Sequence, residues 1–181
     1  QGGEIFTVTG EGYAPVGEIR SDSELVTPAL KPGLMTLLRA SVLCNGAELR
    51  LEAFLWHIVG DPTEGALLVA AAKAGLTKND LEQENPWLGE VPFDSERKKM
   101  TVVRRTPSGP VAFVKGAPDV LLRDCHAWLT RGGDIQPLTD AIRQEIAATN
   151  QRLASQALRV LGVAMRQLDR IPDVYDAKNL E

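Results

Sequence analysis

Basic side chains are concentrated in one short stretch of an otherwise acidic chain. Residues 96–105, ERKKMTVVRR, hold five cations and one anion, whereas the 181-residue chain has 20 Lys and Arg against 24 Asp and Glu, a formal net charge of −4. A cluster of this kind can hold an anionic ligand such as a phosphate. On charge alone it is more typical of an edge strand whose charges prevent sheets from joining edge to edge. Charge alone leaves both interpretations open.

A further cation ends an apolar stretch, where Lys115 is followed by Gly116. A glycine lets a ligand approach the backbone closely, and the ammonium of a neighbouring lysine can face that ligand. Strand periodicity places alternate residues of 111–115 on one face, and alternate residues of 98–102, with Met100 at their centre, on one face. Two such strands side by side form an apolar floor with one or two cations. That floor suits a flat heterocycle attached to phosphates.

Turn signals and apolar periodicity predict the elements that must position these residues. The arms of a hairpin are expected at 100–103 and 111–115, joined by a turn at 107–110. Residues 20–33 predict a loop, 77–85 is a polar stretch assigned to no element, and 47–58 is ambiguous. Strands interspersed with helices, with at least one hairpin, predict an α+β fold with an antiparallel β-sheet flanked by helices. Other strands are expected at 5–9, 90–93 and 159–165, and helices at 34–45, 62–74, 119–125 and 139–156.

The sequence Asp61-Pro62-Thr63-Glu64 predicts the start of one of these helices. Asp61 can accept from the first backbone amides as an N-cap, and Pro62 fits the first helical position. Glu64 stands three residues after the cap and can reach back to it. Gly75 stands where a glycine commonly ends a helix.

Several kinds of site are missing from the sequence. It has no P-loop, no Gly-x-Gly-x-x-Gly and no Gly-x-Ser-x-Gly, and neither His57 nor His126 stands in a catalytic or zinc-binding motif. Cys44 and Cys125 are far apart and predict reduced thiols. No apolar run reaches the 18 residues that a membrane span needs, and a weakly acidic chain is a poor nucleic-acid binder. We therefore expect no catalytic residue and no metal ligand here.

Four motifs follow one another along the chain: GDPTEGAL at 60–67, PFDSERKKM at 92–100, VKGAP at 114–118 and ALRVLG at 157–162. In this order they resemble the nucleotide-binding (N) domain of P-type cation-transporting ATPases, closest to the calcium-pump-like branch. The resemblance extends from about residue 5 to about residue 181. It implies the α+β fold of that domain.

The resemblance implies a set of contacts with the base of ATP. Phe93 would stack on the adenine ring, a contact worth about 1–3 kcal/mol by analogy with other base–aromatic pairs. Glu64 would accept from the adenine amino group or tie the pocket together. Lys115 would close the adenine end, with the backbone of Gly116 approaching the ring, and Leu161 would cover the base.

The resemblance implies further contacts along the pocket and toward the phosphates. Lys98 and Met100 would line the pocket, and Arg159 would reach toward the phosphates. Ser95 departs from the pattern, because animal calcium pumps of this type have a phosphate-contacting arginine there. That contact must be lost here, or supplied by Arg97 or Lys98.

Each of these roles has a structural alternative that the sequence leaves open. Glu64 can be a capping residue, and Phe93, Met100 and Leu161 can belong to a hydrophobic core. Arg159 can pair with a surface acid.

The resemblance also implies what the chain does in its larger context. The Asp-Lys-Thr-Gly-Thr motif whose aspartate the family phosphorylates does not occur, and neither do the motifs that hold magnesium. Residues 1–181 would be a single nucleotide-binding domain excised from a larger membrane pump, at the cytoplasmic face of a membrane. It would bind ATP, with Mg²⁺ in the full-length pump, and present the γ-phosphate to an aspartate on a separate domain without turnover of its own. Its partners would be the phosphorylation and actuator domains, with no direct contact with nucleic acid or membrane, and the fragment would be a monomer.

Two other functions remain as alternatives. One is a non-enzymatic interaction or regulatory domain that keeps the fold but not the nucleotide, for which the serine at position 95 is the best support. The other is a hydrolase built around His57 or His126. Calcium is favoured as the transported cation because the motifs resemble that branch.

Overall fold

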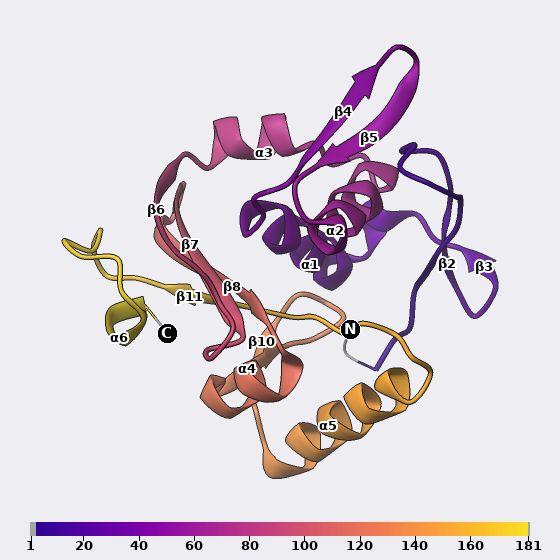
Figure 1. The fold of residues 1–181 in the computed structure, drawn as a ribbon. Coiled ribbons are helices and arrows are strands. Elements are labelled where there is room, and N and C mark those ends of the chain that lie inside the picture. Colours follow the sequence, from indigo (N-terminus) through magenta and orange to yellow (C-terminus); the bar gives the residue numbers. More distant parts are fainter. Residues whose placement is uncertain (1–2, 181) are drawn as a thin grey trace. The chain divides into compact units, whose positions relative to one another are not determined.

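The computed structural model describes residues 3–180, apart from the side chains of residues 178 and 179, and it divides into two compact units. The first comprises residues up to 84 together with 129–134, and the second comprises 85–128 and the residues from 135 onward. Each unit combines short antiparallel strands with helices (Figure 1), so the predicted α+β class is confirmed. Among the described residues, no helix is both long and apolar enough to cross a bilayer.

The first unit begins with a small antiparallel sheet and continues with helices around one hairpin. The prediction of a loop at residues 20–33 is wrong, because two short strands and a 3-10 turn lie in this segment. The polar stretch 77–85, assigned to no element, is largely helix. The elements are β1 Thr7–Val8, β2 Ile19–Ser21, β3 Glu24–Leu25, η1 Pro28–Leu30, α1 Pro32–Leu43, β4 Glu48–Glu52, β5 Leu55–Val59, α2 Pro62–Lys73 and α3 Lys78–Glu84.

Helix α2 has the ends that its sequence predicts. The Asp61 carboxylate accepts from the amides of Thr63 at 2.7 Å and Glu64 at 3.2 Å, as an N-cap does. At the other end Gly75 has φ +83° and donates to Ala72 O, and the next amide donates to Ala71 O. This pair of bonds is a Schellman motif, which satisfies the last carbonyls of the helix.

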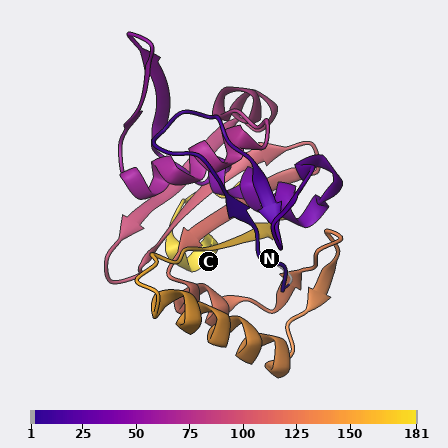
Figure 2. The same cartoon turned by 90° about the vertical axis from the view of Figure 1, so that its right-hand side faces the viewer.

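Strands β4 and β5 resolve the ambiguous segment 47–58 as a hairpin, which extends away from α1 and α2 (Figure 2). Its tip is formed by Ala53 and Phe54, both with positive φ, and the Phe54 side chain is 96% exposed. A two-residue turn of this kind favours Asn-Gly or Asp-Gly. Because neither residue is present, the sequence carries no turn signal here.

The second unit is built on a four-stranded antiparallel sheet with the order β11-β8-β7-β6. The predicted hairpin is present as β7 and β8. The last strand begins at Gly162 rather than Arg159, so the predicted start of that strand is wrong. The elements are β6 Trp87–Asp94, β7 Lys99–Thr106, β8 Gly109–Gly116, α4 Pro118–Asp124, β9 Ala127–Leu129, β10 Ile135–Pro137, α5 Asp140–Ala154, β11 Gly162–Gln167 and α6 Ala177–Leu180. The last residue of β9, Leu129, belongs to the first unit.

The two faces of this sheet carry different residues. We call one the helix face: Val103 and Ala112, opposite each other, are fully buried there in a cluster with Leu180 of α6, and α4 contacts β8 and β11. We call the other the Lys115 face, because Lys115 lies there opposite Met100. The prediction that alternate residues of 111–115 share a face with Met100 is confirmed.

Candidate functional site

Most of the predicted site residues gather at one end of the four-stranded sheet. At this end β6 finishes, β7 begins, β8 finishes and β11 begins. Seven of the eight residues lie in or next to these strand ends, although they come from segments far apart in the sequence. They are Phe93, Lys98, Met100, Lys115, Gly116, Arg159 and Leu161.

Strand register arranges three of them, Phe93, Met100 and Lys115, in one lateral row on the Lys115 face. Met100 of β7 pairs with Lys115 of β8, and Lys115 pairs with Val163 of β11. On the other side of β7, the pairing with β6 shifts between Val91 and Asp94, which pair with Thr101 and Lys99. Residues 92 and 93 of β6 therefore oppose the single residue Met100. This is a β-bulge, which re-aims side chains at a sheet end.

The row joins an exposed aromatic ring to a buried cation. Phe93 is 63% exposed, whereas Met100 is 9% and Lys115 is 5% exposed. The interpretation that Phe93 belongs to a hydrophobic core is therefore wrong. The same interpretation of Met100 agrees with its burial. An exposed phenylalanine between Pro92 and Asp94 leaves a ring face available for stacking on a flat ligand.

Asp94 organises the loop that follows Phe93. Its carboxylate accepts from the amides of Glu96 at 3.0 Å and Arg97 at 2.8 Å, and its carbonyl accepts from the amide of Lys98 at 2.7 Å. Asparagine and aspartate commonly close turns in this way. The Arg97 guanidinium donates to Pro92 O at 2.6 Å, so it is used within the same hairpin.

Lys98 lies in this loop and not in the strand, so the expectation that it continues the alternation of β7 is wrong. It has φ +55°, a left-handed conformation that is uncommon for a lysine. Its carbonyl accepts from Ala117 N at 2.9 Å, which fixes the residue against the end of β8. Its ammonium is exposed and has no hydrogen bond or ion pair among the residues that the structure describes.

Gly116 is required by the packing of the chain itself. A Cβ atom there would lie 2.4 Å from Lys98 O and 2.6 Å from Lys99 Cβ. Gly162 faces it across β8 and β11, and a Cβ there would lie 3.0 Å from Leu121 Cδ1. The glycine that the sequence assigned to the approach of a ligand thus has a local structural cause.

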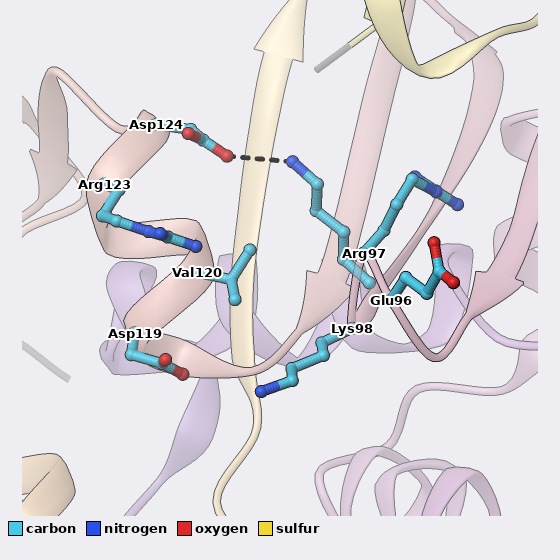
Figure 3. Close-up of a pocket in the computed structure, with 8 residues that line it drawn as sticks. Glu96, Arg97, Lys98, Asp119, Val120, Arg123 and Asp124 are labelled. Carbon is cyan, nitrogen blue, oxygen red and sulfur yellow. Dashed lines mark hydrogen bonds and ion pairs between the residues drawn. The ribbon is translucent and has the colours of Figure 1, made fainter.

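A pocket of about 480 Å³ opens on the helix face at the same sheet end, between the 95–98 loop and α4 (Figure 3). Of the predicted residues, Lys98 is the one that lines it. Charged side chains of both signs form most of its wall, so it is polar and is not an adenine pocket of the expected kind. The lining residues are Glu96, Arg97, Lys98, Lys99, Asp119, Val120, Arg123 and Asp124.

An ion pair lies at this pocket. The ammonium of Lys99, a residue 8% exposed, lies 2.9 Å from the carboxylate of Asp124 at the end of α4. Burial raises the pKa of the neighbouring Cys125 thiol, and the negative charge of Asp124 adds to the shift. Arg143 of α5 donates to the carbonyl of Leu122 and, at 2.9 Å, to that of Cys125. These bonds satisfy carbonyls at the C-terminal end of α4.

The remaining predicted residues lie outside the row. Arg159 is exposed and Leu161 half-buried in the segment before β11. Glu64 belongs to the first unit, where its carboxylate accepts from Gly46 N at 3.0 Å and its carbonyl accepts from the Asn45 side chain at 2.9 Å. At least one Glu64 oxygen therefore holds the loop after α1.

Sequence reasoning missed the second wall of this sheet end. The sequence places Asp119, Arg123 and Asp124 in a predicted short helix and carries no signal of a role for them. The basic run contained Lys99, which was a usable signal. Its partner Asp124 lies 25 positions away, and their contact depends on how α4 crosses the sheet.

No group of three or more His, Cys, Asp or Glu side chains that could hold a metal ion occurs in the described part of the chain. The acids around the pocket are interleaved with cations, and one of them, Asp124, is paired with Lys99. The residues present do not fit a magnesium site.

Comparison with known proteins gives one family. The family model described as "P-type ATPase, cytoplasmic domain N" matches residues 33–181. The cation-transporting ATPase pma1 of Synechocystis is 33% identical over 99% of this chain, and the calcium-transporting ATPase of Bacillus subtilis is 37% identical over 92%. The calcium-transporting ATPase 1 of Lactococcus lactis is 38% identical over 72%. The chain spans 20%, 19% and 14% of the lengths of these three relatives.

Proposed function

Since the chain belongs to the family of P-type ATPase cytoplasmic N domains, we propose that it binds ATP by the adenine end and leaves the triphosphate projecting. In this proposal residues 1–181 act as one nucleotide-binding domain. The γ-phosphate is offered to an aspartate on the phosphorylation domain of a cation-transporting P-type ATPase. Calcium is the cation we propose, because two of the relatives above are named calcium-transporting ATPases.

The observation that carries the proposal is the row of Phe93, Met100 and Lys115 on one face of the sheet. An exposed aromatic ring beside an apolar side chain and a cation suits adenine, which stacks through its face and accepts hydrogen bonds at its edge. We assign stacking to Phe93, the floor to Met100 and the closing of the adenine end to Lys115. Leu161 covers the base from the segment before β11, and the backbone of Gly116 borders it.

The phosphate end falls to Lys98 and Arg159. Serine at position 95 offers no cation, and the Arg97 guanidinium already donates to Pro92 O. Lys98 has an exposed ammonium without a partner among the described residues, so it is the cation of the loop that remains available. Arg159 is likewise exposed. A flexible ammonium can follow a phosphate chain as a point charge.

The proposal assigns neither Glu64 nor magnesium to this end of the sheet. Glu64 ties the N-terminal end of α2 to the loop at Gly46 in the first unit. Mg²⁺ enters with the complete pump, where it accompanies the phosphates. The partners are the phosphorylation and actuator domains, and the domain faces the cytoplasm. Catalysis then depends on positioning the γ-phosphate in line with the aspartate.

The test is the loss of base stacking in Phe93→Ala. Because Phe93 is 63% exposed, the variant keeps its fold. Amide NMR during a nucleotide titration measures the binding. We expect the parent to bind ATP with a Kd of about 0.1–10 mM and to bind GTP more weakly. In Phe93→Ala, loss of one stacking contact of about 1–3 kcal/mol weakens the binding of ATP and the binding of adenosine alike, by about fivefold or more.

Phe54→Ala is the matched control, because it removes another exposed phenylalanine, at the tip of the β4–β5 hairpin. We expect it to bind ATP as the parent does. A Phe93→Ala variant that binds ATP with the parent's affinity contradicts the proposal. A parent with no localised shifts at about 10 mM ATP favours the interaction-domain alternative.

A further inference from the structure

Lys99 is a buried lysine at the pocket whose ammonium pairs with a carboxylate. Its ammonium lies 2.9 Å from Asp124, whose side chain is 51% exposed. A buried ammonium without a partner is costly. A carboxylate in the last turn of a helix is unfavourable with respect to the helix dipole, and a nearby cation offsets this. The ion pair therefore stabilises both the buried Lys99 ammonium and the Asp124 carboxylate at the end of α4.

The pair is joined to the proposed phosphate cation by a single peptide bond. Lys99 occupies the last position of the β-ladder, opposite Asp94 on one side and Gly116 on the other. Lys98 precedes it with φ +55° and is bonded through its carbonyl to Ala117 N. Movement of the Lys99 backbone therefore moves Lys98 and the whole 95–98 loop.

The Asp124 end of the pair is anchored independently. Arg143 of α5 donates to the carbonyls of Leu122, in the last turn of α4, and of Cys125, the residue that follows Asp124. Small residues at Gly116 and Gly162 let this end of the sheet pack closely. Asp124 is thus a fixed point against which Lys99 is held.

We propose that Lys99 and Asp124 form a positioning pair that fixes the 95–98 loop so that the Lys98 ammonium meets the phosphates of the nucleotide. This inference rests on the proposed function. Lys99 itself belongs to the helix face, opposite the face of Met100 and Lys115, and it acts through Lys98 without touching the base. Figure 3 shows Lys98 and Asp124 on the two sides of the pocket.

The test is Asp124→Asn in the whole chain, with ATP and adenosine as the two probes. We expect ATP to bind about three- to tenfold more weakly and adenosine to change by less than about twofold, because adenosine lacks the phosphates. Lys99→Met is the complementary variant, and Asp124→Glu, which keeps the charge, restores most of the ATP affinity. Asp173→Asn is the matched control, since it removes an exposed carboxylate that pairs with Arg170 in the same unit.

A second readout needs no nucleotide. The amide of Ala117 donates to Lys98 O, so we expect its hydrogen exchange to be faster in Asp124→Asn than in the parent. Unchanged ATP affinity in Asp124→Asn overturns the inference, and so does an equal loss of ATP and adenosine binding. If the parent binds neither probe, the nucleotide function itself is refuted. The Ala117 exchange then still decides whether the pair fixes the loop.

Discussion

Replacement of Gly116 by alanine tests whether this glycine serves the chain's own packing. The added methyl group would lie 2.4 Å from Lys98 O, 2.6 Å from Lys99 Cβ and 2.7 Å from Lys99 Cα. Ordinary carbon contacts are about 3.5–4.0 Å. To remove these clashes, the backbone must shift by about 1 Å. The β7–β8 ladder and the hydrogen bond from Ala117 N to Lys98 O hold that backbone in place.

The size of the effect follows from these contacts. Overpacking a closely packed site costs about 1–3 kcal/mol. Two of the three neighbouring atoms belong to the backbone and cannot rotate away, so we expect the upper end, about 3 kcal/mol. In a chain of this length each kcal/mol lowers Tm by about 2–4 °C, which gives a loss of about 6–12 °C.

Thermal unfolding without nucleotide, followed by circular dichroism, measures this loss. Gly132→Ala is the control, because a Cβ there would meet the end of the Asp134 side chain at 3.2 Å, and that side chain can move. We expect this control to stay within about 0.5 kcal/mol of the parent.

The result that refutes the reasoning is a Gly116→Ala variant with the parent's Tm. If such a stable variant also fails to bind ATP, the glycine is reserved for the ligand, as the sequence resemblance implies. If it is destabilised as expected, weak ATP binding by this variant carries no information on contact with the base.

Two further predictions concern the first unit. Asp61→Ala removes the acceptor of the Thr63 and Glu64 amides and should cost about 1 kcal/mol of unfolding free energy in a urea titration, whereas Asp61→Asn should cost less. The hydrogen bond from Lys31 lowers the pKa of Glu4, so its stabilising effect is present above the unfolded pKa and is lost as pH falls through the lowered folded value. Carboxyl NMR should show this low pKa in the parent and a higher pKa in Lys31→Met; equal pKa values in the two proteins would contradict the assignment.

Elements with local signals could be predicted from the sequence. Helix α2 carries its N-cap at Asp61 and its glycine stop at Gly75, and the β7–β8 hairpin carries its turn residues. Helix α3 was missed because it buries one apolar residue, Leu81, and so has no apolar periodicity. Its start is marked by Thr77, whose hydroxyl accepts from the amide of Asp80 at 3.2 Å.

The grouping of the candidate site residues could be predicted only in part. Alternation in β7 and β8 is enough to bring Met100 and Lys115 onto one face. The bulge that adds Phe93 to their row depends on the pairing of β6, which no local signal reports. The left-handed backbone of Lys98 and the contact of Lys99 with Asp124 depend on tertiary packing and lie beyond periodicity.

The connectivity of the four-stranded sheet has a consequence for the order of folding. Strands β7 and β8 are joined by a two-residue turn, so their pairing closes a short loop and costs little chain entropy. Strand β11 pairs with β8 only after residues 117–161 have been made and brought back, a far less local contact. During synthesis the pairing of Met100 with Lys115 therefore precedes the arrival of Arg159 and Leu161. If these residues bind adenine as we propose, a nascent chain acquires the floor of the site before it acquires the segment proposed to cover the base.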